Sequence, residues 1–174
     1  MDFIPIARPS LNHSDLDGIR DVFKSRWFGL GKVTTEFESQ VSKLCDDRSI
    51  LATNTGTTAI EIALRALGIG PGDDVLVPAM TCVATAQAMQ ATGARLILCD
   101  IDASTLNVSV ETLESARTVT TRAAVPVFYR GLALDIESIV VWGKENAVRF
   151  VEDAEHAFGS HTPEGVPVGV CDRV

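Results

Sequence analysis

The stretch "LATNTGTTAIEIALRALGIGPGDDVLVP", residues 51–78, contains two apolar runs separated by an amphipathic segment. The runs "SILAT" at 49–53 and "DVLVP" at 74–78 are typical of buried strands. Between them, apolar side chains recur at helical spacing over residues 57–67, and the glycine turn "GPGDD" follows. A strand, a helix and a second strand in this order predict the βαβ unit of a parallel sheet.

The same alternation continues along the chain. Further helices are predicted at 81–91, 110–116 and 135–145, and further strands at 95–99, 123–128 and 149–153. Two helices precede the alternation: one over 14–23 with Ser14 as its cap, and one that opens with the capping-box pattern of Thr35 and Glu38. The sequence therefore predicts the α/β class, with three α/β/α layers, a mainly parallel sheet and a single domain.

Composition excludes several classes of function. The 174 residues are 46% hydrophobic, and 15 basic against 23 acidic side chains give a net charge of −8. This charge repels nucleic acid and anionic membranes, so neither is an expected partner. The N-terminus lacks the apolar region of a secretory signal, and no apolar run reaches the length of about 20 residues that a bilayer span needs. A soluble, cytoplasmic protein is expected.

The cysteines indicate neither a zinc site nor a disulfide framework. Cys45, Cys82, Cys99 and Cys171 are widely spaced, and no CxxC pair occurs among them. Cys99 belongs to an apolar strand pattern, where a buried and inert thiol is expected.

The polar segment 54–58, "NTGTT", follows a predicted strand and opens a predicted helix. Gly56 allows close approach of a ligand, and the helix start favours an anion, with the hydroxyls of Thr57 and Thr58 as further donors. A phosphate site is one interpretation. A simple N-cap by Thr57 is the other. The segment matches neither the dinucleotide fingerprint nor the P-loop.

The segment "LCDIDASTL", residues 98–106, permits a different chemistry. A strand followed by Asp100-x-Asp102 is similar to the start of haloacid-dehalogenase-type phosphatases, with Lys144 and the acids at 152–153 available to complete a magnesium site. The hydroxyl residues that follow are out of register for that function. An ordinary acidic turn after a strand is the simpler interpretation.

A third polar cluster follows the last predicted strand, in "FVEDAEHAFGSH" at 150–161. Ligands of open α/β sheets bind outside the carboxyl ends of the strands, so this cluster is a candidate site. A carboxylate that caps the next turn is the alternative for Asp153. Glu152 and Glu155 are expected to be solvated or structural.

Together, "NTGTTAIEIALRALGIGPGDDVLVPAMTCVATAQAM", "GARLILCDIDASTLNV" and "RFVEDAEHAFGS" resemble the DegT/DnrJ/StrS family of pyridoxal-phosphate (PLP) sugar aminotransferases. The resemblance covers essentially the whole chain and explains "DIDASTLNV" as that family's turn after a strand. It implies that residues 1–174 form the N-terminal portion of an incomplete fold-type I large domain.

The resemblance also implies roles for individual residues. Gly56, Thr57 and Thr58 would hold the cofactor phosphate. Asp153 would face the pyridine nitrogen and keep it protonated, and His156 would lie near the phenolic oxygen. Cys82 takes the place where the family usually stacks an aromatic ring on the cofactor.

The Schiff-base lysine of the family lies beyond the equivalent of Val174, so no catalytic residue is assigned within this chain. Four lysines are present, and all are expected on helix surfaces or in the glycine turn: Lys24, Lys32, Lys43 and Lys144. The family reaction transfers an amino group from glutamate or glutamine to a nucleotide-linked keto sugar in a homodimer. A fragment that is inactive alone is expected, and a non-catalytic remnant or a phosphatase remains as an alternative.

Overall fold

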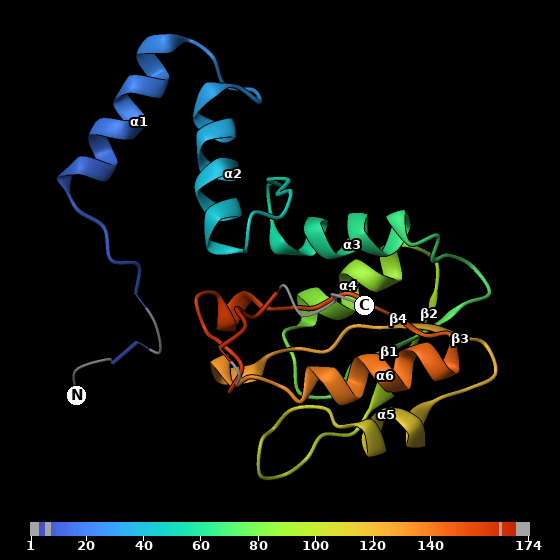
Figure 1. Ribbon diagram of the computed structural model, residues 1–174. Coiled ribbons are helices and arrows are strands. Elements are labelled where there is room, and N and C mark those ends of the chain that lie inside the picture. The colour runs from blue at the N-terminus through green and yellow to red at the C-terminus, as the bar shows by residue number, and fades with distance from the viewer. Residues whose placement is uncertain (1–3, 6–7, 164, 170–174) are drawn as a thin grey trace. The chain divides into compact units, whose positions relative to one another are not determined.

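The structure is a computed structural model that describes residues 4–5, 8–163 and 165–169, so Cys171 and Val174 lie outside the described residues. The chain divides into two units, residues 1–37 and 38–174. The first contains α1 (His13–Ser25) and the beginning of α2 (Lys32–Leu44). The second contains the sheet and all later elements (Figure 1).

Helix α1 is capped by Asn12, so the prediction of Ser14 as the cap was wrong. The side chain of Asn12 accepts a hydrogen bond from the Ser14 amide at 2.8 Å, and the Asn12 amide donates to Asp15 at 2.7 Å. This reciprocal pair is a capping box, and its N-cap lies two residues before the predicted Ser14.

The predicted capping box of Thr35 and Glu38 was also wrong. Helix α2 begins at Lys32, and the Thr35 amide already donates to the Gly31 carbonyl at 3.0 Å. The Glu38 carboxylate accepts a hydrogen bond from the Ala52 amide at 2.8 Å instead. This contact uses an amide of segment 49–53, which was predicted as a strand and has no strand structure.

The four strands are parallel and lie in the order β2-β1-β3-β4. Their bounds are β1 (Asp74–Pro78), β2 (Arg95–Cys99), β3 (Thr121–Ala124) and β4 (Arg149–Phe150). The predictions of β1 and β2 are confirmed to the residue. Strand β1 is buried throughout, as expected for the centre of a parallel sheet covered on both faces.

Strands β3 and β4 are shorter than predicted because Pro126 has no amide to donate. Regular pairing of β3 ends at Ala124, just before this proline. The chains stay adjacent beyond it, since Asp153 donates its amide to the Pro126 carbonyl at 2.9 Å and forms a parallel bridge with Val127.

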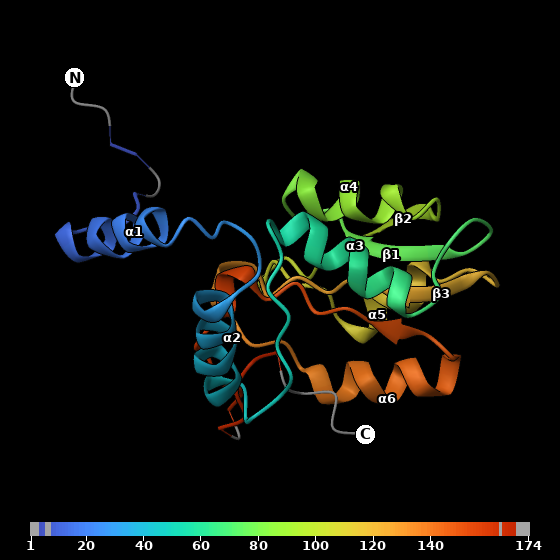
Figure 2. The same cartoon turned by 90° about the horizontal axis from the view of Figure 1, so that it is seen from above.

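Helices cover both faces of the sheet, so the three-layer prediction is confirmed (Figure 2). The helices are α3 (Gly56–Ala66), α4 (Val83–Ala91), α5 (Val110–Ala116) and α6 (Ile136–Asn146). On one face, Leu64 of α3 and Met89 of α4 pack against Val75 and Val77. On the other, Leu113 of α5 and Ile139 of α6 share a core with inward side chains of the sheet. Among the described residues, no helix has the length and apolarity to cross a membrane.

The strand order places a topological switch between β1 and β3. The chain leaves β1 through α4 toward β2, and reaches β3 through α5 on the opposite face. Ligands of open α/β sheets bind beyond the carboxyl ends of the strands at such a point. The segments that follow β1 and β3 are therefore the expected place for a ligand site.

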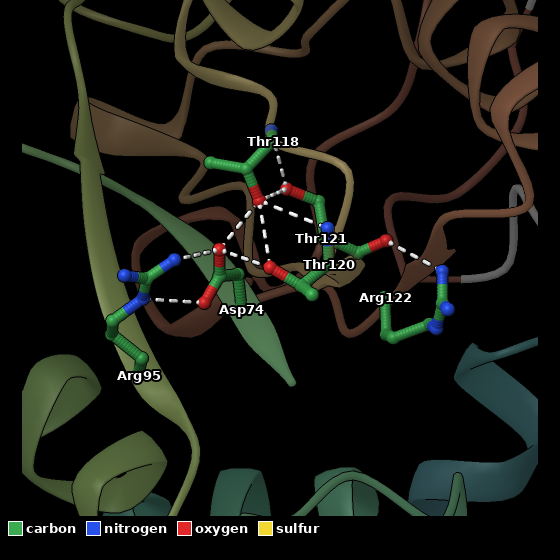
Figure 3. A network of polar contacts seen from close by, with 6 residues as sticks. All are labelled: Asp74, Arg95, Thr118, Thr120, Thr121 and Arg122. Carbon is green, nitrogen blue, oxygen red and sulfur yellow. Dashed lines mark hydrogen bonds and ion pairs between the residues drawn. The ribbon is translucent and has the colours of Figure 1, made fainter. Parts of the chain in front are cut away.

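The amino-terminal edge of the sheet carries a polar network instead (Figure 3). Asp74, the first residue of β1, is 2% exposed and accepts two hydrogen bonds from the Arg95 guanidinium, at 2.7 and 2.6 Å. The hydroxyls of Thr118 and Thr120 donate to the same carboxylate at 2.5 and 2.8 Å. The Arg95 hydrogen bonds hold the pKa of Asp74 far below its ordinary value.

Candidate functional site

Asp153 lies at the carboxyl-terminal edge of the sheet, on the continuation of β4. Its amide donates to the Pro126 carbonyl at 2.9 Å and its carbonyl accepts from the Phe128 amide at 3.0 Å. These two bonds fix the backbone, and only 8% of Asp153 is exposed. A carboxylate in this position is held rigidly beside the topological switch.

Thr85 of α4 binds this carboxylate. Its hydroxyl donates to Oδ2 of Asp153 at 2.7 Å and lies 2.8 Å from the Thr81 hydroxyl. Thr85 is 1% exposed, and the hydrogen bond leaves the second oxygen, Oδ1, outside this pair. Sequence reasoning missed Thr85. The available signal was two threonines four residues apart on a helix that follows a buried strand.

The start of α3 offers backbone donors to an anion. Thr55 is the N-cap, rather than the predicted Thr57, and its hydroxyl accepts from the Thr58 amide at 3.1 Å. First-turn amides have no partner within their own helix. Among the hydrogen bonds of the described residues, none uses the amides of Gly56 or Thr57. These two amides are therefore available to a ligand at the helix terminus.

Gly56 brings the start of α3 to the 153–156 segment. A Cβ atom built on Gly56 would lie 1.8 Å from Oε1 of Glu155, so no larger residue fits here without displacing that carboxylate. Glu155 begins the short 3-10 helix η2 (Glu155–Ala157), two residues after Asp153. Gly56 and Glu155, which are 99 residues apart in the sequence (155 − 56), thus lie together.

His156 lies at the surface next to η1 (Tyr129–Gly131). Its ring centroid is 5.7 Å from that of Tyr129, at an interplanar angle of 54°. A Cβ on Gly131, whose φ is +75°, would lie 2.9 Å from the His156 carbonyl oxygen. A side chain larger than glycine at position 131 would therefore clash with the backbone of His156, whose imidazole is exposed.

The three described cysteines lie in different environments. Cys82 is the N-cap of α4, three residues before Thr85, and its thiol is exposed and makes no capping hydrogen bond. Cys99 is 1% exposed, and burial raises the pKa of its thiol to about 12. The expected burial of Cys99 is confirmed.

Asp102 is used by the turn after β2. Its carboxylate accepts from the Ser104 and Thr105 amides, at 2.8 and 3.0 Å, and from the Ser104 hydroxyl, which lowers its pKa. In the described part of the chain, no group of three or more His, Cys, Asp or Glu residues could hold a metal ion. Lys144 is exposed on α6. No observation favours the phosphatase interpretation.

The residues at the carboxyl-terminal edge fit a pyridoxal-phosphate group chemically. The α3 terminus provides amide donors and a glycine at the point of closest approach, which suits a phosphate. Asp153 provides a buried carboxylate with one oxygen anchored, which suits a protonated pyridine nitrogen. Two exposed residues lie close in sequence to this pair: Cys82 is three residues before Thr85, and His156 is three residues after Asp153.

Comparison with known proteins identifies the family of this chain. The family model of the DegT/DnrJ/EryC1/StrS aminotransferases matches residues 9–174. Spr1654 of Streptococcus pneumoniae, a proposed sugar aminotransferase solved in its PMP form, has 31% sequence identity and a TM-score of 0.86; the match covers 95% of this chain and 46% of Spr1654.

Two further solved structures are similar over most of this chain. DesV of S. venezuelae, in complex with a ketimine intermediate, has 33% identity and a TM-score of 0.80, covering 84% of this chain and 40% of DesV. The 3-amino-5-hydroxybenzoic acid synthase has 32% identity and a TM-score of 0.86, covering 94% of this chain and 43% of the synthase.

The chain spans less than half of the length of each of these proteins. The four-stranded parallel sheet with its covering helices is part of the fold-type I architecture that they share. The match over residues 9–174 establishes the family, and this chain belongs to the DegT/DnrJ/EryC1/StrS aminotransferases.

Proposed function

We propose that this chain carries the phosphate and pyridine contacts of a PLP-dependent sugar aminotransferase of the cytoplasm. The complete enzyme would transfer an amino group from glutamate or glutamine to a keto sugar linked to a nucleotide. Family membership supports the reaction class, and the residues of the carboxyl-terminal edge support the cofactor.

The observation that carries this proposal is the buried Asp153 carboxylate anchored by Thr85. A carboxylate that is 8% exposed needs a compensating partner, and a single hydroxyl at 2.7 Å is a modest one. A protonated ring nitrogen next to Oδ1 would complete its environment. The cofactor, when bound, supplies an electron-withdrawing ring to the substrate carbon.

The other residues have supporting roles in the proposal. The Gly56 and Thr57 amides would hold the phosphate, with the hydroxyls of Thr57 and Thr58 as further donors. Cys82 would lie beside the ring, and His156 would hydrogen-bond to the phenolic oxygen and help to orient the cofactor.

We further propose that this chain does not transaminate by itself. Covalent catalysis of this kind needs an amine held at the cofactor aldehyde with its pKa lowered by its surroundings. All four lysines are exposed, at positions 24, 32, 43 and 144. The nucleophile of the complete enzyme is therefore proposed to lie in sequence beyond these 174 residues, in line with the expected N-terminal portion of a large domain.

The assembly is proposed to be a homodimer in the complete enzyme. In the first unit, α1 has no buried residue, and its Leu16, Ile19 and Phe23 are 56%, 56% and 65% exposed. An apolar helix face of this kind needs a covering surface, which a second copy of the chain would supply in this proposal. Sedimentation at micromolar concentration should detect self-association, and a stable monomer would contradict it.

The test of the cofactor proposal measures binding rather than turnover. Purified chain is titrated with pyridoxal phosphate, and ring absorbance and fluorescence report the dissociation constant for wild type, Asp153→Asn and Asp100→Asn. We expect weak, non-covalent binding that Asp153→Asn weakens about tenfold or more, the loss of one charge-assisted hydrogen bond. Asp100→Asn, at an exposed aspartate, is the matched control and should bind as wild type does.

Borohydride reduction followed by peptide mapping completes the experiment. We expect no lysine to be labelled stoichiometrically and no amino transfer from glutamate. A single labelled lysine together with turnover would overturn the proposal that the nucleophile lies elsewhere. Equal affinity of wild type and Asp153→Asn would overturn the role of Asp153.

A further inference from the structure

We propose that Glu155 is an internal competitor of the cofactor phosphate: its carboxylate lies against Gly56 at the start of α3 and must move before a phosphate can bind there. This inference rests on the proposed function, because it concerns the same helix terminus. It assigns a role to a residue that the sequence pattern indicated only as solvated or structural.

The first support is the close contact between Glu155 and Gly56. A Cβ built on Gly56 would lie 1.8 Å from Oε1, 3.0 Å from Cδ and 3.8 Å from Cγ of Glu155. The carboxylate thus fills the volume that a side chain would take at the first residue of α3. A phosphate that approaches the same glycine would need the same volume.

The second support is electrostatic. Helix α3 has eleven residues, and its N-terminus carries the partial positive charge of the helix dipole. The Thr58 amide is bound by Thr55, while no hydrogen bond among the described residues uses the Gly56 and Thr57 amides. None of the ion pairs in the described part of the chain includes Glu155. The Glu155 carboxylate therefore lies beside a partially positive helix terminus whose first two amides are not hydrogen-bonded to it.

The third support is that Glu155 can move. It begins the short helix η2 and is exposed, so its side chain can rotate into water without disturbing the core. A phosphate and a carboxylate at one helix terminus repel each other, so binding of one favours departure of the other. The cost lowers the affinity for phosphate-bearing ligands and leaves ligands without a phosphate unaffected.

The experiment compares three probes on the full chain: pyridoxal phosphate, inorganic phosphate and pyridoxal. Calorimetry measures the dissociation constants of wild type, Glu155→Gln and the matched control Glu145→Gln, which removes an exposed carboxylate on α6. We expect Glu155→Gln to bind both phosphate-bearing probes about fivefold tighter, the scale of one carboxylate–phosphate repulsion near water. The affinity for pyridoxal should stay the same, and Glu145→Gln should match wild type throughout.

A second measurement needs no ligand. If the carboxylate rests on Gly56, the amide resonances of Gly56 and Thr57 should shift in Glu155→Gln and stay in place in Glu145→Gln. Unshifted resonances, or equal phosphate affinity of wild type and Glu155→Gln, would overturn the inference.

Failure of the proposed function has a different signature. Pyridoxal phosphate would then bind no tighter than pyridoxal, and Asp153→Asn would have no effect. The amide resonances of Gly56 would still decide whether Glu155 occupies the helix terminus.

Discussion

The two edges of the sheet each carry a buried aspartate, and the two are used differently. Asp74 at the amino-terminal edge accepts hydrogen bonds from Arg95, Thr118 and Thr120 (Figure 3). The Asp153 carboxylate at the carboxyl-terminal edge accepts a side-chain hydrogen bond from one donor among the described residues, Thr85. A carboxylate whose bonds are complete stabilises the fold, whereas one with capacity left over can bind a ligand.

The largest effect should come from breaking the complete network. Asp74→Ala should lower the free energy of unfolding by about 2–3 kcal/mol, because two threonine hydroxyls and a guanidinium lose their acceptor. This loss of stability is smaller than for a fully buried ion pair, because the Arg95 side chain is 67% exposed and water can solvate its charge in the variant. Urea unfolding measures the change. Asp100→Ala, at an exposed aspartate of the opposite edge, should change it by less than about 0.5 kcal/mol.

The second prediction concerns pH. The Arg95 hydrogen bonds lower the pKa of Asp74 in the folded chain, so the unfolded chain binds a proton first as the solution is acidified. Stability contributed by Asp74 is thus complete above the unfolded pKa of about 4 and is lost as pH falls below it. Urea midpoints between about pH 6 and about pH 3 should fall less steeply in Asp74→Asn than in wild type. Parallel curves would contradict this.

The third prediction concerns the carboxyl-terminal edge, where the Asp153 carboxylate can accept further hydrogen bonds. Thr85→Val keeps the shape but removes the donor to Asp153, and should cost about 1–2 kcal/mol of stability. It should also weaken pyridoxal-phosphate binding, because the carboxylate loses its anchor. Thr92→Val is the matched control on the other end of α4: its hydroxyl donates to the Met89 carbonyl at 2.7 Å. That variant should lose stability and keep its affinity; loss of affinity in both would contradict a specific role for Thr85.

The smallest effect is expected at Cys82. Cys82→Tyr adds an aromatic face at the exposed N-cap of α4 and should tighten pyridoxal-phosphate binding about threefold, within the range of one stacking contact. Fluorescence titration measures the change. Val83→Tyr, at the adjacent exposed residue, should leave the affinity unchanged. An equal gain in both variants would indicate general hydrophobic contact.

Much of the sheet could be predicted from the sequence because its signals are local. The apolar runs of β1 and β2 and the helix α5 have the predicted bounds. Segment 49–53 has the same kind of apolar pattern and is not a strand, since its Ala52 amide is bound by the Glu38 side chain. A contact across fourteen residues leaves no trace in the periodicity.

The residues of the candidate site also differ in whether a local sequence signal predicts their positions. Asp153 could be predicted because its position after a strand places it at a known edge of the sheet. Thr85 and Glu155 could not, because their positions depend on which helix lies over which strand end. The hydrogen bond from Thr85 spans 68 residues of sequence, and only the assembled layers bring its partners together.

That separation has a consequence for the order of folding. Strands β1 and β2 with α4 between them close a short loop, whereas Asp153 joins Thr85 only after β3 and β4 have been added. The entropy lost on loop closure grows with loop length, so the ligand edge forms after the centre of the sheet. During synthesis on the ribosome, α4 would emerge with Thr85 lacking its acceptor until residue 153 had left the exit tunnel. The proposed cofactor contact at Asp153 can therefore form only after β4 has been added to the sheet.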